Sequence, residues 1–150
     1  MLTGNDAVAA ILLTEDGRYV MQLRDDKPDI WYPNHWGCFG GAVEAGESPE
    51  QALERELSEE IELPPRMGTY FTRFDFDMKV LGLQSYYRIY YLLTLSAGEL
   101  ERLRIHEGRE IQAFDGDSLL RSERVTPYDA FALMLHHDRA RIGRGWKGEV

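Results

Sequence analysis

The 150-residue chain is 43% hydrophobic and 29% charged, which is ordinary for a single globular domain spanning residues 1–150. Its 26 acidic residues outnumber its 17 basic ones, and the formal net charge of −9 disfavours nucleic acid and anionic membranes as partners. No apolar run approaches the ~18 residues of a membrane span, the first residues lack the basic region of a signal peptide, and the lone Cys38 excludes an intramolecular disulfide. A cytoplasmic protein is therefore expected.

The first half of the chain predicts three strands and a helix. Residues 6–14 form a short apolar run that ends in a turn, which is typical of a strand buried on both faces, and residues 18–25 follow at hairpin spacing. An aromatic, proline-containing loop then leads to a short strand over 35–41 that closes in a glycine pair. A helix is expected over 49–61, stopped by the prolines at 64–65.

The second half predicts further strands. Residues 68–76 and 85–95 are rich in aromatic and β-branched side chains, which favour strands. A shorter strand is expected over 109–115, followed by a turn with a helical start over 115–122. Strands with one helix in the middle and another near the end predict an α/β/α sandwich around a mixed sheet.

Residues 126–140 are predicted to form a capped amphipathic helix, with Thr126 at the N-cap and Pro127 at the first position. The side chains expected on its core face are Ala130, Phe131, Leu133, Met134 and His137. Because neighbouring helical residues diverge by about 100°, His136 is expected in solvent and His137 at the edge of the core.

The helix over 49–61 carries an unusual concentration of acid. Ser48, Pro49 and Gln51 give it a capping-box start, and Leu53, Leu57 and Ile61 make a narrow apolar stripe. The carboxylates that fall in the adjacent arc are Glu56, Glu59 and Glu60. Like charges at this spacing destabilise a helix by a few tenths of a kcal/mol per pair. A hard divalent cation bound between the carboxylates would make their proximity favourable instead. The helix alone leaves a solvated acidic face and a metal site equally open.

Residues 41–63, "GAVEAGESPEQALERELSEEIEL", decide between the two interpretations. They resemble the signature of the Nudix hydrolases: Gly, five residues, Glu, seven residues, then Arg-Glu-apolar-any-Glu-Glu-any-Gly-apolar. The positions that fit are Gly41, Glu47, Arg55, Glu56, Leu57, Glu59, Glu60 and Leu63. The exception is Glu62, where the family usually has glycine. Glu62 can adopt the left-handed turn that suits glycine only at a cost of roughly 1 kcal/mol, or else the helix ends differently because of Pro64, and altered loop geometry is expected.

The resemblance implies a pyrophosphohydrolase that cleaves a nucleoside diphosphate linked to another group and uses Mg²⁺ or Mn²⁺. It implies that Glu56, Glu59 and Glu60 bind the metal together with the carbonyl of Gly41. Arg55 would orient these carboxylates by salt bridging, and Glu47 would support it. Catalysis of phosphoryl transfer by metal-held charge neutralisation is consistent with this residue set.

Further candidates lie outside the signature. Some members of the family place an extra catalytic glutamate in a loop, which the resemblance would put at Glu107 or Glu110. A solvated carboxylate is the favoured explanation for each, and His106 is more often structural. Trp31 and Tyr32 are candidates for stacking on a base or sugar, whereas Trp36 and Phe39 are expected in the core. Arg24 would meet a phosphate, or else form a surface ion pair with an adjacent aspartate.

Three functions are compatible with these features. The favoured one is hydrolysis of a nucleotide-type small molecule, with nucleotide sugars slightly ahead of oxidised nucleoside triphosphates or ADP-ribose. The second is a catalytically silent nucleotide-sensing module, which the deviation at Glu62 would suit. A Ca²⁺-binding or structural domain is the weakest, because the acidic pieces lack EF-hand spacing. A homodimer is common enough to be expected.

Overall fold

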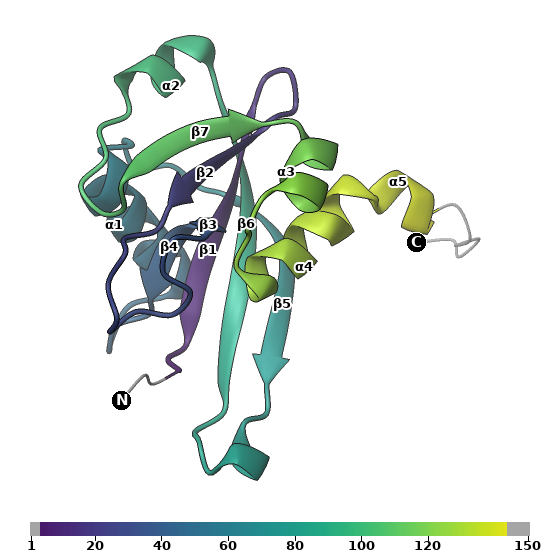
Figure 1. Ribbon diagram of the computed structural model, residues 1–150. Helices are drawn as coiled ribbons and strands as arrows, with labels where there is room; N and C mark the ends of the chain where they lie inside the picture. The colour runs from purple at the N-terminus through teal and green to yellow at the C-terminus, as the bar shows by residue number, and fades with distance from the viewer. Residues whose placement is uncertain (1–3, 144–150) are drawn as a thin grey trace.

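The computed structural model describes residues 4–143, except the side chain of Ser122, and contains one mixed sheet (Figure 1). Its strands are β1 (Ala7–Thr14), β2 (Tyr19–Leu23), β3 (Trp36–Gly37), β4 (Phe39–Ala42), β5 (Thr69–Phe76), β6 (Tyr86–Leu95) and β7 (Glu110–Phe114). They follow the order β3-β2-β1-β6-β5, with β4 beside β1 and β7 beside β2. Strands β1 and β6 run parallel, and the other pairs are antiparallel.

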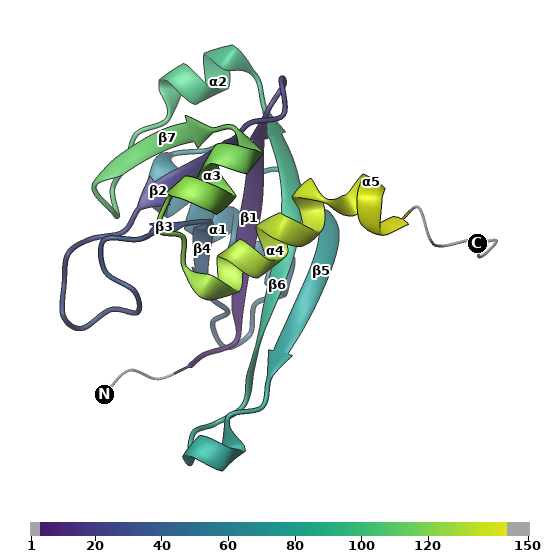
Figure 2. The ribbon, with the colours of Figure 1, turned by 45° about the vertical axis from the view of Figure 1, so that its right-hand side comes forward.

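Helices cover both faces of this sheet (Figure 2). Helix α1 (Pro49–Ile61) packs on one face, where the core includes Val8, Leu12, Phe39, Leu53 and Leu57. On the opposite face lie α3 (Gly116–Ser122) and α4 (Pro127–His137), over a core that includes Ile11, Tyr90, Leu119 and Leu133. The predicted α/β/α sandwich around a mixed sheet is confirmed. Among the described residues, no helix has both the length and the apolar character to cross a membrane.

The strand expected over 35–41 is two strands, because the segment changes partner at Cys38. Trp36 and Gly37 pair with β2, whereas the stretch from Phe39 onward pairs with β1. The result is that Gly40 and Gly41 lie in β4, next to the parallel pair β1 and β6.

Helix α1 has the predicted bounds because both of its ends are specified locally. Ser48 accepts a hydrogen bond from the Gln51 N–H, and the Gln51 side chain accepts one from the Ser48 N–H, which completes the capping box. At the other end Glu62 takes a left-handed conformation with φ 55° and ψ 30°. Glu62 therefore forms the turn that suits glycine, and the altered turn geometry expected from its identity is wrong.

Two short elements were not expected: the 3₁₀ turn η1 (Lys79–Leu81) and helix α2 (Ala97–Arg102). The second has its own signal, since Ser96 and Glu99 form a capping box. The helix expected over 126–140 ends at His137, and α5 (Arg139–Ile142) follows it after Asp138.

The predicted core face of the last long helix is partly wrong. The buried residues of α4 are Asp129, Ala132, Leu133 and His136. Phe131 and Met134 are instead 50% and 40% exposed. His136 is buried, not solvated, and its Nδ1 shares a 2.7 Å hydrogen bond with the Tyr19 hydroxyl on β2. Thr126 is at the N-cap position but donates to the Asp129 carboxylate, 2.8 Å away.

Candidate active site

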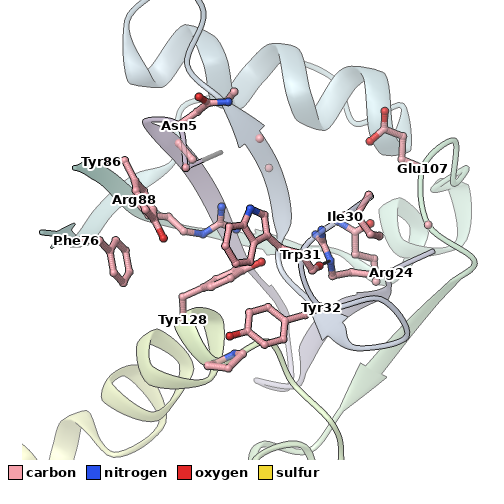
Figure 3. Close-up of a pocket in the computed structure, with 18 of the residues that line it drawn as sticks. Asn5, Arg24, Ile30, Trp31, Tyr32, Phe76, Tyr86, Arg88, Glu107 and Tyr128 are labelled. Carbon is pink, nitrogen blue, oxygen red and sulfur yellow. Dashed lines mark hydrogen bonds between the residues drawn. The ribbon is translucent and has the colours of Figure 1, made fainter. Parts of the chain in front are cut away.

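A cavity of about 1170 Å³ opens beside the N-terminal ends of β1 and β6. Its wall includes Gly40, Gly41, Glu60 and Glu107 from β4, the end of α1 and the loop before β7. In Figure 3, Glu107 lies on one side of the cavity, well apart from the aromatic side chains of Phe76, Tyr86 and Tyr128. The cavity thus has an acidic end and an aromatic end.

The glycine pair allows two carboxylates to lie against the sheet. The Gly40 N–H donates to Glu60 Oε2 at 2.9 Å. A Cβ atom on Gly41 would lie within 2.6 Å of the Glu56 carboxyl carbon and both its oxygens. Any larger residue at Gly41 would therefore displace Glu56. Gly40 is equally constrained, since its φ is 140° and a Cβ there would lie 2.2 Å from the Val8 carbonyl oxygen.

Arg55 lies at the centre of a network of carboxylates on the same helix and the preceding loop. Its Nη2 is 2.7 Å from Glu47 Oε1, and its Nη1 is 2.9 Å from Glu56 Oε1 and 3.3 Å from Glu59 Oε2. Nη2 also donates to the Ala42 carbonyl at 3.0 Å. Arg55 therefore ties the helix to β4 and partly neutralises the acidic arc.

The two carboxylates nearest the sheet are poorly compensated. Burial raises the pKa of Glu60 to about 8, opposed by the Gly40 N–H and reinforced by the negative charges of Glu56 and Glu107. Burial also raises the pKa of Glu56, although Arg55 acts against it. The Glu59 side chain, in contrast, is 62% exposed and contacts Arg55. Within residues 4–143, no three acidic, histidine or cysteine side chains converge on a point where one ion would be held.

The donor chemistry at this end nevertheless fits a hard divalent cation. Carboxylate oxygens are the ligands that Mg²⁺ and Mn²⁺ prefer. Glu56 occupies the space beside Gly41 that a side chain there would fill, and Glu60 lines the cavity. A cation bound here would offset the burial and the neighbouring negative charges that raise the pKa values of these two groups.

The three predicted substrate-binding residues also line the cavity. Trp31 and Tyr32 are 38% and 37% exposed, whereas Trp36 and Phe39 are in the core as predicted. Arg24 forms neither of the expected ion pairs with Asp25 or Asp26; its Nε donates to the Trp31 carbonyl at 2.9 Å, and Lys27 pairs with Asp25. Arg24 thus anchors the aromatic loop.

That loop has a strained conformation at the cavity wall. Tyr32 and Asn34 have φ values of 49° and 58°, in the left-handed region that non-glycine residues avoid. The Tyr32 ring packs against those of His35 and Tyr128, with centroids 5.5 and 5.9 Å apart. Left-handed residues of this kind cluster at ligand sites, which fits the position of Tyr32.

Of the downstream acids, Glu107 lines the cavity, whereas Glu110 begins β7 and is exposed. The loop that carries Glu107 is held to the end of α1. The His106 N–H donates to the Glu60 carbonyl at 2.8 Å, and His106 Nε2 lies 2.6 Å from Glu62 Oε1. The residue that departs from the signature, Glu62, therefore contacts this loop.

Sequence reasoning missed a buried polar group at the aromatic end. The Asp129 carboxylate, on a residue that is 1% exposed, accepts hydrogen bonds from the Cys38 N–H, the Thr126 and Tyr90 hydroxyls and Arg88. Burial lowers the pKa of Arg88, but the charge of Asp129 together with Tyr90, Tyr128 and Cys38 outweighs it, and the net shift of the pKa is upward. No sequence signal indicated this pairing, because its members come from the link between β3 and β4, from β6, and from the start of α4.

Comparison with known proteins supports the resemblance seen in the sequence. The NUDIX domain model matches residues 4–140. The chain is 53% identical to the 8-oxo-dGTP diphosphatase of Haemophilus influenzae over 69 residues, which are 46% of this chain and 49% of that protein. It is 41% identical to the nucleoside triphosphatase NudI of Escherichia coli (strain SE11) over 50 residues, 33% and 35% of the two chains. The matched regions thus span half or less of these curated relatives.

The fold is also similar to solved structures. One, from a study of MutT of Aliivibrio salmonicida and Vibrio cholerae, has a TM-score of 0.68 and 28% identity, and the alignment covers 86% of this chain and 93% of that one. The domain match covers nearly all the residues that build the sheet, both helical layers and the cavity. The chain belongs to the NUDIX domain family.

Proposed function

We propose that the protein is a divalent-metal-dependent pyrophosphohydrolase that cleaves a phosphate anhydride in a nucleoside diphosphate linked to another group. The observation that supports this most directly is the two-ended cavity, in which Glu60 and Glu107 line the same space as Trp31 and Tyr32. The acidic end suits a metal-bound diphosphate and the aromatic end a flat base. A nucleotide presents both in one molecule.

The relatives favour one substrate class over the others. The names of the two curated relatives refer to dGTP in its 8-oxo form and to nucleoside triphosphates. The sequence alone placed nucleotide sugars slightly ahead, so the comparison shifts the proposal to nucleoside triphosphates. The sensing module expected as the alternative rested on Glu62, and that residue keeps the turn that glycine would make.

We assign the metal-binding role to Glu56, Glu59 and Glu60 together with the Gly41 carbonyl. Glu59 would bind the metal only after giving up its contact with Arg55. When bound, Mg²⁺ or Mn²⁺ would neutralise phosphate charge and lower the pKa of a coordinated water. Arg55 holds Glu56 in place through its 2.9 Å contact and is itself fixed by Glu47.

Glu107 is the residue we assign to proton transfer. Glu107 lines the cavity, and within residues 4–143 its side chain forms no hydrogen bond or ion pair. In the reaction the oxygen of water attacks phosphorus, its proton passes to Glu107, and the anhydride P–O bond breaks with its electron pair on the leaving phosphate. Trp31 and Tyr32 would hold the base while this occurs.

The test is a turnover screen with Mg²⁺ or Mn²⁺ over nucleoside triphosphates, oxidised triphosphates, nucleotide sugars, dinucleoside polyphosphates and ADP-ribose. The Glu59→Gln and Glu60→Gln variants are expected to lose at least about 100-fold in kcat/KM, because each loses a metal-binding oxygen's charge. Removing the metal with EDTA is expected to abolish turnover in the wild type.

Glu54→Gln provides the matched control, since it is the same substitution on the same helix outside the acidic arc. Mg²⁺ should also raise the melting temperature of the wild type and of this control, but not of Glu60→Gln. Folded Glu59→Gln and Glu60→Gln variants with full activity would refute the metal assignment. A wild type that turns over none of the substrates would favour the sensing module.

A further inference from the structure

Arg88 holds its guanidinium inside the aromatic end of the cavity (Figure 3). The side chain is 14% exposed. Its Nε lies 3.1 Å from the Tyr90 hydroxyl and 3.3 Å from Asp129 Oδ1, and its Nη2 is also 3.3 Å from Asp129 Oδ1. One edge of the guanidinium is therefore occupied by groups behind the cavity wall.

The position of Arg88 is fixed. Asp129 is itself bound by the Cys38 N–H at 2.9 Å and the Thr126 hydroxyl at 2.8 Å, so its carboxylate has little freedom to turn. The Arg88 guanidinium carbon also lies 5.0 Å from the ring centroid of Tyr128, within the range of a cation–π contact. The side chain is thus preorganised before any ligand arrives.

The other edge of the guanidinium remains available. Among residues 4–143, no protein group accepts a hydrogen bond from Arg88 Nη1. The Nη1–Nη2 edge can donate two parallel hydrogen bonds to a pair of adjacent acceptors. Since Asp129 already balances the charge of Arg88, this edge favours a neutral pair of acceptors over a second anion.

We propose that Arg88 is a specificity-determining residue that selects bases with two adjacent acceptors. Guanine offers O6 and N7, and cytosine offers O2 and N3, as two adjacent acceptors, whereas adenine, uracil and thymine have no such pair. A guanine oxidised at C8 carries hydrogen on N7 and is disfavoured for the same reason. The inference rests on the proposed function, because it requires a nucleotide whose base enters the aromatic end.

Aromatic rings line this end of the cavity and can contact the face of a flat ligand. Tyr128 and Tyr32 have ring centroids 5.9 Å apart, and Trp31 lies next to Tyr32 with centroids 6.4 Å apart. All three line the cavity together with Arg88. Stacking on such rings is tolerant of base identity, so discrimination between bases has to come from a polar group, and Arg88 is placed for it.

The first experiment measures kcat/KM of the wild-type protein with Mg²⁺ for dGTP, dCTP, dATP and dTTP. Discrimination of about 10-fold or more in favour of dGTP and dCTP is expected, the range for one bidentate pair. The analogue 7-deaza-dGTP lacks only the N7 acceptor of dGTP, and its kcat/KM is expected to be lower than that of dGTP by a similar factor. For dCTP the 3-deaza analogue serves the same purpose.

The second experiment uses Arg88→Lys and Arg88→Met. Lysine keeps the charge but cannot make the two-pronged contact, so both variants are expected to reduce the discrimination to within about 3-fold. The change should appear in KM, with kcat retained, since the base contact is the same in ground and transition states. Arg18→Met, at the β1–β2 turn, is the matched control and should keep the wild-type ratios.

Titration calorimetry with the four α,β-methylene triphosphates and Mg²⁺ measures the same preference without turnover and without a mutation. Equal binding and equal turnover of all four bases would overturn the role of Arg88 while leaving hydrolysis intact. Discrimination in binding with no hydrolysis of any nucleotide would support Arg88 and refute the proposed function. Discrimination that persists unchanged in folded Arg88→Lys also overturns the inference.

Discussion

At the scale of single residues, Asp129 shows how a buried charge is made tolerable. Its carboxylate is surrounded by donors from three separate segments: Cys38, Tyr90 with Arg88, and Thr126. A charge without such partners would cost several kcal/mol in the interior. Its contacts with Arg88 also mean that the stability of this region and the geometry of the cavity depend on the same side chain.

We predict that Asp129→Ala lowers the free energy of unfolding by about 3–5 kcal/mol, because it leaves the buried Arg88 charge without its counterion and orphans the Cys38 N–H. Urea denaturation measures this. Asp26→Ala, in the exposed loop before β3, is the control and should change stability by no more than about 0.5 kcal/mol. A loss for Asp129→Ala as small as that of the control would contradict the description of the network.

Neither Asp129 nor Arg88 was predictable from the sequence. Arg88 lies within an aromatic strand and Asp129 within the first turn of a helix, 41 residues apart, where acids are ordinary. Their pairing requires knowing that β6 and α4 meet. The signature residues could be proposed from the sequence because their spacing carries the information. Gly41 and Glu60 of the signature line one cavity with Arg24, Trp31, Tyr32 and Glu107.

At the scale of elements, α1 and α4 show what local signals can specify. The bounds of α1 follow from Ser48 at its start and the turn at Glu62, both within the helix's own sequence. The buried face of α4 was not predictable in this way. Its orientation depends on His136 meeting Tyr19, a partner 117 residues away, and on Asp129 meeting β6.

The turn at Glu62 leads to a prediction about α1. Glu62 has φ 55°, a conformation that costs a non-glycine residue about 1 kcal/mol relative to glycine. Both side chains of its contact with His106 are exposed, so this contact contributes little to the free energy of unfolding. Glu62→Gly is therefore expected to stabilise the protein by about 0.5–1 kcal/mol and to raise the melting temperature by about 3 °C.

Glu62→Ala is the control for this change, because it removes the same side chain without relieving the backbone. Calorimetry should find it no more stable than the wild type. If Glu62→Gly instead destabilises the protein as much as Glu62→Ala, the contact with His106 outweighs the backbone cost, and the loop that carries Glu107 depends on Glu62.

At the scale of the whole molecule, His136 joins the last long helix to two strands. Its ring packs edge-on against Tyr19 of β2 and Phe71 of β5, with centroids 5.7 and 5.4 Å away. Burial lowers its pKa to about 4, and the positive charges of Arg139 and His137 act in the same direction. The histidine is thus neutral in the native state and must stay so for the layers to pack.

This predicts a loss of stability in mild acid. The unfolded chain binds a proton at His136 near pH 6.5 and the folded chain only near pH 4, so stability falls as pH drops through that window, by about 1.4 kcal/mol per unit. Glu56 and Glu60, with raised pKa values, act in the opposite sense. The measurement is therefore the difference between the wild type and His136→Gln.

Urea titration measures the unfolding free energy of both proteins. Between pH 6.5 and pH 5 the wild type should lose about 2 kcal/mol more than His136→Gln. The carboxylates are common to both proteins and cancel. A difference that is independent of pH would show that His136 titrates in the folded protein as it does in the unfolded chain.

The reactivity of Cys38 can report local opening of the fold. It is the only cysteine of the chain and is 2% exposed, and burial together with the charge of Asp129 raises the pKa of its thiol. A reagent that requires the thiolate can reach it only when the segment between β3 and β4 opens. The rate of labelling therefore reports how often the glycine-bearing wall of the cavity separates from β1, and any ligand that closes this wall will slow it.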